Sequence, residues 1–367
     1  MKIAHLTSVH QRYDTRIFLK ECRSLAAAGH SVYLVVADGK GDESREGVEI
    51  KDVGVSSGRL NRMLRTTRRI YDKALAVDAE IYHMHDPELI PVGLKLKRKG
   101  KKVIFDAHED LPKQLMGKPY LNKFSRLVLS KAFGVFESIA CRKFDAVVVA
   151  TPSISEKFIK INPLTVTVNN YPLLGELSTN NVDWAAKKNE VSYIGGITSI
   201  RGIAQVISAM SKVKSDVRLQ LGGRFSEKNV EAVAKQEQGW GKVDELGFVS
   251  REGVRDALAR SVAGIVTFLP APNHIDSQPN KMFEYMSAGV PVIASNFPLW
   301  RDIIEGNNCG LCVDPEDSQK IAEAIDYLVL NPAQAESMGV NGQLAVRLKY
   351  NWSIEEKVLV GLYARLA

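Results

Sequence analysis

The chain has 367 residues, 45% of them apolar, and a formal net charge of +7. This length exceeds one ordinary hydrophobic core and indicates a globular protein of two domains. No run of 18 apolar residues occurs, and the N-terminus enters a strand pattern without an apolar signal core, so we expect a cytoplasmic protein.

The positive charge is concentrated in the first half. Residues 1–172 hold 29 Lys and Arg against 19 Asp and Glu, whereas the remainder holds 20 against 23. A segregated basic surface suits an anionic partner such as a membrane. Aromatic residues make up 7% and show no stacking pattern, which argues against nucleic acid. The four cysteines are scattered, and the CxxC pair Cys309 and Cys312 has no second pair to complete a zinc set, so we interpret them as ordinary thiols.

The first half alternates strands and helices. Residues 2–8, 31–37 and 48–55 are strand-like and too apolar to alternate, and a helix over 15–30 separates the first two. This pattern is typical of a parallel sheet covered on both faces, whose ligands bind beyond the carboxyl ends of the strands. The loop after the first strand lies at that edge and holds His10, Asp14 and Arg16. The alternative is that Asp14 caps the following helix and Arg16 lies on the surface. It lacks the GxGxxG sequence of NAD enzymes.

Two further strands end in clusters of ionisable residues at the same edge of the sheet. These residue types suit a metal site. No HExxH or similar helical pairing occurs, however, so we expect no metal there. The two clusters are His83, His85 and Asp86, and Asp106, His108, Glu109 and Asp110.

Two helical segments of the first half are amphipathic and basic. Such helices suit docking on an anionic lipid surface, although a plain solvated face is the alternative. The segment after residue 58 has a predicted buried stripe of Leu60, Met63, Leu64, Thr67, Tyr71 and Ala74, with Arg62, Arg65, Arg69 and Lys73 on another face. In the segment over 117–145, Lys118, Lys123, Arg126 and Lys131 interleave with apolar residues.

A polar stretch over 175–189 indicates an interdomain linker. After it, EVSYIGGITSIRG predicts a strand, a glycine turn and a helix. Gly195 and Gly196 allow a phosphate to approach the backbone, and Arg201 adds a positive charge. Further strands over 217–223, 243–250 and 263–271 continue the βαβ rhythm.

Residues 274–295 predict a loop, a helix that begins after Pro279, and a strand. The first amides of the helix, around Asn280 and Lys281, would be free to bind a diphosphate. Glu284 lies one turn further and Asp276 on the approach loop, where carboxylates can reach sugar hydroxyls. The alternative is that both are ordinary solvated acids.

This segment resembles the signature of family 4 retaining glycosyltransferases, in which an acidic residue, seven others and a Glu precede a helix that ends in Ala-x-Gly-x-Pro-Val-Ile. Asp276 stands at the first acidic position, and Glu284 and AGVPVIAS match directly. The family also has Gly-Arg and a later Lys where this chain has Gly195, Gly196 and Arg201.

The resemblance implies the GT-B architecture, an α/β fold of two doubly wound Rossmann-like domains that face each other across a cleft. We expect the domains to span 1–172 and 173–352, with a C-terminal helix over 353–367 packing back on the first. The family implies that the second domain binds the donor and the first domain the acceptor.

The resemblance also implies roles for individual residues. The catalytic candidates are His108, Asp276 and Arg201, and His10, Asp14 and Arg16 are the acceptor-side candidates. The expected donor-binding residues are Gly195, Gly196, Arg201, Phe248, Val249, Ser277, Asn280, Lys281 and Glu284.

The implied activity is transfer of a sugar from a nucleotide-diphosphate sugar, a UDP-sugar, to an acceptor hydroxyl with retention of configuration, without a metal or other cofactor. We expect a saccharide or lipid-linked acceptor in bacterial surface polysaccharide assembly, such as lipopolysaccharide, capsule or exopolysaccharide. We also expect peripheral binding at the inner face of the plasma membrane. The alternative is a sugar-nucleotide epimerase of the same architecture, which would release an isomer without an acceptor.

Overall fold

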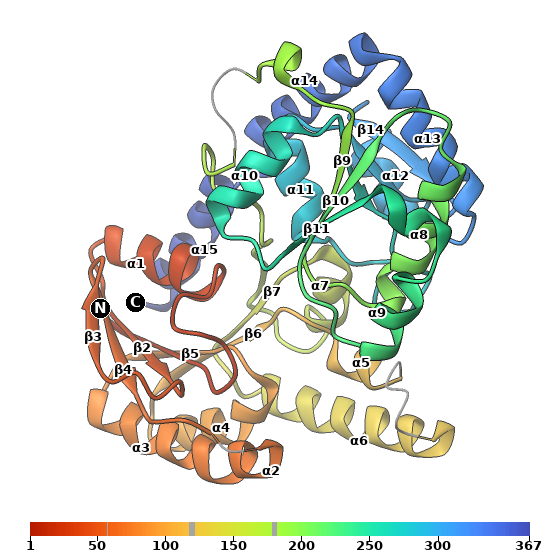
Figure 1. The fold of residues 1–367 in the computed structure, drawn as a ribbon. Coiled ribbons are helices and arrows are strands. Elements are labelled where there is room, and N and C mark those ends of the chain that lie inside the picture. The colour runs from red at the N-terminus through yellow and green to blue at the C-terminus, as the bar shows by residue number, and fades with distance from the viewer. Residues whose placement is uncertain (57, 117–121, 178–181) are drawn as a thin grey trace. The chain divides into compact units, whose positions relative to one another are not determined.

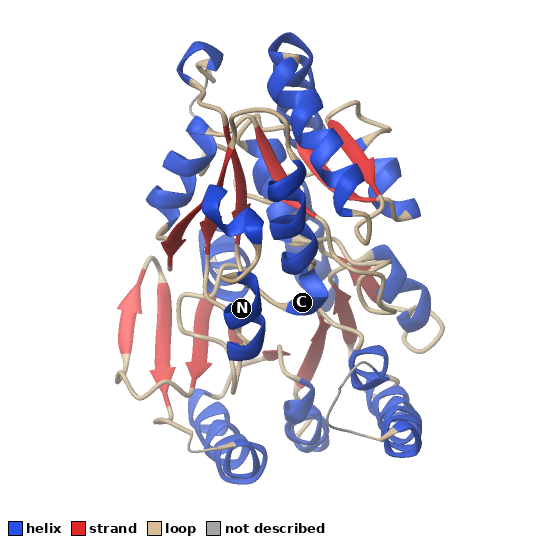
Figure 2. Ribbon diagram, turned by 45° about the vertical axis from the view of Figure 1, so that its right-hand side comes forward, coloured by secondary structure: helices blue, strands red, loops and turns tan. Residues whose placement is uncertain are grey.

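A computed structural model describes residues 1–56, 58–116, 122–177 and 182–367. The chain divides into two compact units. Unit 1 consists of Met1–Asn170 with Trp352–Ala367, and unit 2 is Tyr171–Asn351. The expected linker over 175–189 falls within unit 2, and its residues 178–181 lie outside the described part of the chain. Each unit is an α/β structure built on one sheet (Figures 1 and 2).

The sheet of unit 1 has the strand order β3-β4-β2-β1-β5-β6-β7-β8. All neighbours in this order pair in parallel except the edge strand β3, which is antiparallel to β4. The strands are β1 (Lys2–Leu6), β2 (Ser31–Val36), β3 (Glu43–Arg45), β4 (Val48–Asp52), β5 (Ile81–Met84), β6 (Lys102–Ala107), β7 (Ala146–Val149) and β8 (Thr165–Thr167).

Helices cover both faces of this sheet. On one face, α3 and α4 pack on an apolar core that includes Leu6, Tyr82 and Phe105. The other face lies under η1 and α15. The helices are η1 (Ile17–Cys22), α1 (Arg23–Ala27), α2 (Arg59–Asn61), η2 (Arg62–Thr66), α3 (Thr67–Val77), η3 (Pro87–Leu89), α4 (Ile90–Arg98), α5 (Leu111–Met116), α6 (Lys123–Cys141), α7 (Pro152–Phe158) and α15 (Trp352–Leu366).

The sheet of unit 2 is entirely parallel, with the order β11-β10-β9-β12-β13-β14. This is the 3-2-1-4-5-6 order of the Rossmann fold. Apolar clusters lie on both faces, one under α8 and α13 and the other under α10, α11 and α12. The strands are β9 (Glu190–Ile194), β10 (Arg218–Gly222), β11 (Val243–Gly247), β12 (Ala263–Val266), β13 (Val292–Ser295) and β14 (Gly310–Val313). The helices are η4 (Trp184–Ala186), η5 (Ser199–Arg201), α8 (Ile203–Lys212), α9 (Lys228–Ala234), η6 (Gln238–Lys242), α10 (Arg251–Arg260), α11 (Asn280–Ser287), α12 (Pro298–Ile304), α13 (Ser318–Leu330) and α14 (Pro332–Leu348).

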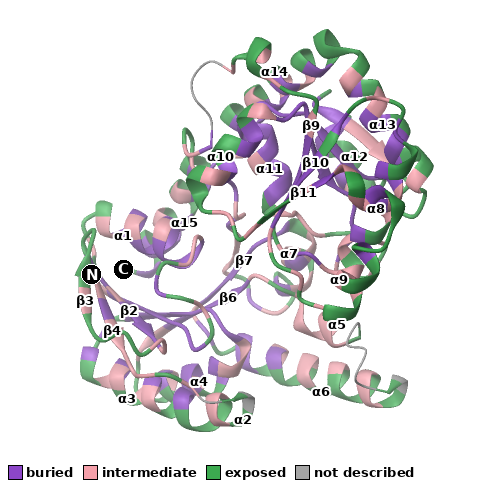
Figure 3. Cartoon of the chain, in the orientation of Figure 1, coloured by how far each residue is buried: buried purple, intermediate pink, exposed green. Residues whose placement is uncertain are grey.

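The predicted buried stripe after residue 58 is wrong at its start. Leu60 and Leu64 are 76% and 72% exposed, and Met63 is also exposed, whereas α3, further along this segment, packs on the sheet and buries Thr67 and Ala74. The helix α6 likewise leaves most of its apolar side chains in solvent (Figure 3). No helix among the described residues is long and apolar enough to span a bilayer.

Candidate functional site

Polar side chains gather at the carboxyl edge of each sheet, where the strand order reverses between β1 and β5 and between β9 and β12. Open parallel sheets bind ligands at such switch points. We call the group in unit 1 the histidine edge and the group in unit 2 the lysine site. The histidine edge comprises His10, Asp14, His85, Asp86, Asp106 and His108, and the lysine site comprises Gly195, Gly196, Arg201, Lys281 and Glu284.

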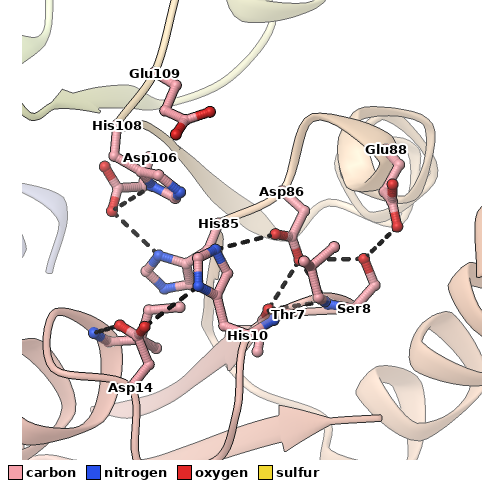
Figure 4. Close-up of polar contacts among 12 residues, drawn as sticks. Thr7, Ser8, His10, Asp14, His85, Asp86, Glu88, Asp106, His108 and Glu109 are labelled. Atoms are coloured by element: carbon pink, nitrogen blue, oxygen red, sulfur yellow. Dashed lines mark hydrogen bonds and ion pairs between the residues drawn. The ribbon is translucent and has the colours of Figure 1, made fainter. Parts of the chain in front are cut away.

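Asp86 fixes the start of the loop that follows β1. Its Oδ2 accepts hydrogen bonds from the Thr7 hydroxyl at 2.9 Å and from the Ser8 backbone amide at 2.5 Å (Figure 4). The Thr7 hydroxyl oxygen in turn accepts the amide of His10 at 3.0 Å. The end of β5 therefore dictates the path of the loop that carries His10.

His10 lies between two carboxylates. Its Nδ1 is 3.3 Å from Asp14 Oδ2, and its Nε2 is 3.4 Å from Asp86 Oδ1. Burial lowers the pKa of His10, but the hydrogen bond with Asp14 and the charge of Asp86 outweigh it and leave the pKa raised. Burial raises the pKa of Asp14, yet His10 and backbone amides bring it down to about 2. His10 and Asp14 thus stabilise each other's charged forms, and both side chains remain partly open to solvent.

Asp106, at the end of β6, connects the buried Arg16 and His85 to His108. Arg16 donates to both of its oxygens at 2.8 and 2.9 Å, and His85 Nδ1 lies 3.1 Å from Oδ2. His108 Nδ1 is 3.6 Å from the same oxygen. Burial raises the pKa of Asp106, but the charge of Arg16 and the neighbouring imidazoles hold it well below its ordinary value. Asp106 is therefore an ionised carboxylate that orients two imidazoles.

The three acceptor-side candidates occupy different environments. Arg16 is buried, with its guanidinium bound to Asp106 and to the Val168 carbonyl, so the alternative of a surface arginine is wrong. Asp14 accepts the amides of Arg16 and Ile17 at the start of η1, as the capping alternative expected, while its second oxygen faces His10. His10 and His108 lie with ring centroids 5.3 Å apart.

In the lysine site, the side chain of Lys281 is buried at the first turn of α11. Its ammonium lies 3.8 Å from the ring centroid of Tyr193 and 5.3 Å from that of Phe268. It donates no hydrogen bond to any residue that the structure describes. Burial and the nearby charge of Arg201 lower the pKa of Lys281 to about 7. A buried ammonium without an acceptor is costly, and an anion would supply one.

The glycine turn after β9 runs beside this ammonium. Gly195 has φ +123°, and a Cβ built there would lie 4.0 Å from Lys281 Nζ. Arg201 Nη1 donates to the Gly196 carbonyl at 3.2 Å, and its guanidinium carbon lies 5.4 Å from the Phe268 ring centroid. A side chain at Gly196 would collide with Arg201, at 2.7 Å from Nη1. The structure therefore brings Gly195, Gly196, Arg201 and Lys281 together.

Glu284 is one turn further along α11. Its Oε1 accepts a hydrogen bond from Arg251 Nη1 at 2.7 Å, and Arg251 Nε donates to Glu176 at 2.8 Å. Tyr285, the next residue, accepts the Ile194 amide through its hydroxyl at 2.9 Å, which ties α11 to the end of β9. The helix is thus fixed against the strand that carries the glycine turn.

The other predicted donor residues surround this group. The Ser277 hydroxyl donates to the His274 carbonyl, and the Ser277 carbonyl accepts from the Trp300 indole at 2.7 Å, so Ser277 anchors the loop. Asp276 and Asn280 are exposed on either side of it. Phe248 and Val249 follow β11, with Phe248 exposed and stacked near Arg224 and Val249 packed partly into the core.

Several site residues were not predicted from the sequence. Arg251 pairs with Glu284 from 33 residues away, and Tyr193 faces Lys281 from inside a strand. Glu21 and His5 lie beneath His85 on the floor of the histidine edge. A Tyr or His within an apolar strand carries no local signal of its partner. Only the alternation of β1 and β5 could have indicated that His5, His83 and His85 share a face.

Two family models match the chain. The model of glycosyl transferases group 1 matches residues 177–345, and the model of glycosyltransferase family 4 matches residues 15–169. Together they account for most of both units.

The phosphatidyl-myo-inositol mannosyltransferase of Mycobacterium leprae is 28% identical over 171 residues, which are 46% of this chain and 44% of that protein. The capsular polysaccharide biosynthesis glycosyltransferase CapM of Staphylococcus aureus is 24% identical over 183 residues, 47% of this chain and 45% of that protein. The match thus spans less than half the length of these curated relatives.

The structure of Anabaena HepE in complex with UDP and glucose superposes with a TM-score of 0.76 and 13% identity, covering 100% of both chains. Such a superposition over the whole chain shows a common fold. The two units of the present chain, each built on a parallel sheet, are those of GT-B glycosyltransferases, which confirms the predicted fold class. The chain belongs to the group 1 glycosyl transferase family.

Proposed function

We propose that this protein is a retaining glycosyltransferase that moves a sugar from a UDP-sugar to an acceptor hydroxyl. The observation that carries the proposal is the buried ammonium of Lys281, which has no hydrogen-bond acceptor among the described residues and lies beside Arg201 and a glycine turn. A diphosphate at the lysine site would supply the missing acceptor.

In this proposal the diphosphate lies at the start of α11. The amide of Met282 donates to the Pro279 carbonyl, whereas the amides of Asn280 and Lys281 have no backbone acceptor among the described residues. In this proposal these two amides bind the phosphates. The Glu284 carboxylate accepts hydrogen bonds from the ribose hydroxyls. It does so either while it keeps its ion pair with Arg251 or after the ribose has replaced Arg251 as its partner. Phe248 and Val249 flank the base. The complex of HepE with UDP supports uracil as that base.

Transfer requires that negative charge on the leaving diphosphate be stabilised while the sugar becomes oxocarbenium-like. Arg201, Lys281 and the helix amides perform the first task without a metal ion. His108 and Asp276 contact the sugar. A leaving-phosphate oxygen takes the proton of the acceptor hydroxyl, so the reaction needs no separate side-chain base. The acceptor oxygen then bonds to the sugar on the same face from which the diphosphate leaves, which gives retention of configuration.

We assign the acceptor to unit 1, at the histidine edge near His10 and Asp14, with Arg16 holding the edge through Asp106. The acceptor in this proposal is lipid-linked, and the reaction serves surface polysaccharide assembly at the inner face of the plasma membrane. Exposed apolar and basic side chains on α2, η2 and α6 support contact with an anionic lipid surface. The names of the mannosyltransferase and CapM point to the same kinds of acceptor.

The proposal is tested by thermal shift and transfer assays against a panel of UDP- and GDP-sugars. We expect one UDP-sugar to raise Tm and to be consumed only when an acceptor lipid is present. Formation of an isomer from the donor alone would instead indicate an epimerase.

Glu284→Ala should lower transfer by at least about 100-fold, because several hydrogen bonds to the ribose help to position the donor. Its Tm should stay within a few degrees of the wild-type value. The matched control is Glu336→Ala, which removes an exposed carboxylate of the same unit and should leave turnover unchanged. Near-normal turnover of Glu284→Ala would remove this residue from the donor site.

A further inference from the structure

One face of the unit 1 sheet is polar at its centre. Strand alternation turns His5 of β1 and His83 and His85 at β5 toward η1, which contributes Glu21. All four side chains are fully buried, and a ring nitrogen of each histidine and a carboxylate oxygen of Glu21 lie within 4.8 Å of one another. Buried polar groups normally have hydrogen-bond partners, so three imidazoles and a carboxylate gathered away from solvent need an explanation.

Hydrogen bonds account for only part of this group. His85 Nδ1–H donates to the ionised Asp106, so His85 Nε2 carries a lone pair, and His5 Nδ1 lies 2.8 Å from it. The Tyr363 hydroxyl of α15 is hydrogen-bonded to His83 Nδ1 at 2.8 Å, and an ion bound at this nitrogen would replace that hydrogen bond. Both oxygens of Glu21 and the Nε2 atom of His83 receive no hydrogen bond from an N–H or O–H group of the described residues. Burial and the charge of the adjacent Asp106 raise the pKa of Glu21, so a protonated Glu21 that donates to Asp106 is the competing explanation for this carboxyl group. Arg16 Nε lies 3.1 Å from Glu21 Oε1, but its hydrogen is directed to Asp106.

The spacing of these atoms suits a tetrahedral metal ion. Two ligand atoms bound to zinc at about 2.0–2.1 Å lie roughly 3.3 Å apart. Glu21 Oε2 is 3.8 Å from His5 Nδ1, 3.8 Å from His85 Nε2 and 4.0 Å from His83 Nδ1, and the two nitrogens of His5 and His85 are 2.8 Å apart. These four separations differ from the tetrahedral value by about 0.5–0.7 Å, and all the ligand atoms lie within 4.8 Å of one another.

The groups around two of the three histidines also match those of a metal site. Ligating histidines usually donate their second ring N–H to a carboxylate or another oxygen, which fixes the tautomer. Asp106 does this for His85, and the Tyr363 hydroxyl lies 3.4 Å from His5 Nε2. We propose that His5, Glu21, His83 and His85 form a buried site for a divalent transition metal ion of the zinc class.

Four protein ligands close the tetrahedron, so the ion would be structural and would not take part in the transfer reaction. It would join β1, β5 and η1 directly under Asp106, which orients His108. Spacing along the chain predicts no such site, because the ligands come from three elements and His5 lies 80 residues from His85. Of these four, only His83 and His85 belong to the ionisable clusters visible in the sequence.

The test uses the untagged full chain, expressed with added zinc and passed through gel filtration. We expect about one zinc per chain by elemental analysis. Metal-free protein given Co²⁺ should show the strong visible absorption of tetrahedral cobalt, and adding Zn²⁺ should raise its Tm. Absence of stoichiometric zinc together with no cobalt spectrum and no Tm response would overturn the proposal.

The variant Glu21→Gln distinguishes a site that holds a metal ion from one in which Glu21 is merely protonated, because glutamine resembles a protonated Glu21 in shape and polarity. If an ion binds, this variant should bind Zn²⁺ at least about 100-fold more weakly and lose the Tm response, since one ligand charge is gone. The matched control is Glu355→Gln, a buried carboxylate of the same unit that accepts hydrogen bonds from Asn169 and should leave metal content unchanged. Equal zinc affinity in Glu21→Gln and the wild type would contradict the assignment.

Discussion

The Lys281 ammonium is held between two aromatic faces with Arg201 nearby, and its pKa of about 7 follows first from burial and then from the charge of Arg201. Aromatic faces attract a cation but cannot accept the strong hydrogen bonds that an ammonium makes in water. In the free protein this lysine is therefore only partly charged near neutral pH. A diphosphate would favour the charged form.

This coupling predicts proton uptake on nucleotide binding. At pH 8 the free Lys281 is mostly neutral, so binding of UDP should take up close to one proton, whereas at pH 6 the lysine is already charged and uptake should vanish. The affinity for UDP should accordingly fall as the pH rises above about 7. Titration calorimetry in buffers of different ionisation enthalpy measures the uptake directly.

Lys281→Met keeps the length and apolar stem of the side chain. We expect it to abolish the proton uptake and to weaken UDP binding by about 1.5–3 kcal/mol, the usual contribution of a charged hydrogen bond. Uptake at pH 8 that persists in Lys281→Met would assign the titrating group to another residue.

At the residue scale, sequence reasoning could predict what contiguous motifs encode. Gly195, Gly196 and Arg201 lie in one segment and Lys281 and Glu284 in another, and the structure places the first three beside Lys281. Partners far apart in the chain could not be predicted. Arg251 reaches Glu284, and Glu21 meets His5, only because packing of helices on the sheet brings these elements together.

At the element scale, a single glycine controls the entry to α8. Gly202 has φ +75° and precedes the helix, and a Cβ there would collide with the Thr267 carbonyl oxygen. Gly361 lies within α15, and a Cβ at this position would have no neighbouring atom within 4 Å among the described residues. A side chain is therefore excluded at Gly202 by backbone conformation and by a collision, whereas one can be accommodated at Gly361.

Gly202→Ala should lower the free energy of unfolding by roughly 2–4 kcal/mol, because left-handed strain adds to a backbone collision. Gly361→Ala should raise it by about 0.5–1 kcal/mol, since alanine favours a helix interior. Urea denaturation of both variants measures the pair. A loss of less than about 0.5 kcal/mol in Gly202→Ala would show that the turn can relax.

The segments α2, η2 and α6 lie on the same face of the unit 1 sheet (Figures 1 and 2). Their periodicity predicts amphipathic helices, but it cannot distinguish an apolar stripe that meets the core from one that meets something outside the chain. The periodicity predicts Leu60 and Leu64 in the core, whereas the structure exposes both. Exposed apolar side chains beside arginines and lysines are the pattern of interfacial helices.

The proposed contact with a membrane predicts binding to anionic vesicles. The protein should sediment with vesicles that contain anionic lipid at low salt and much less with neutral ones. Replacing Phe124 and Val135, which are 76% and 60% exposed on α6, by serine should weaken binding by about tenfold or more, since each loses roughly 1 kcal/mol or more of apolar transfer free energy. Val340→Ser, an exposed apolar site in unit 2, is the matched control. Equal failure to bind both kinds of vesicle would remove the membrane from the proposal.

At the scale of the whole molecule, the two units differ in how the chain builds them. Unit 2 is one continuous stretch, whereas unit 1 is completed by α15 at the far end of the chain. The alternation of strands and helices was sufficient to predict the fold class, because βαβ order and apolar strands dictate parallel sheets covered on both faces. It could not predict that one of the covered faces in unit 1 would be polar, since that depends on which helix lies over His5 and His83.

Removal of α15 should therefore affect one unit and spare the other. In a chain that ends at Asn351, unit 1 loses the buried side chains of Trp352, Leu359, Leu362 and Tyr363. Each large apolar side chain contributes about 1.5–3 kcal/mol, so the total approaches the roughly 5–15 kcal/mol by which a typical domain is stable. Hydrogen exchange measured by mass spectrometry should show lost protection in β1, β5 and η1 and unchanged protection in the strands of unit 2, which serve as the internal control. Protection of β1 and β5 at the level of the full chain would mean that unit 1 folds without its last helix.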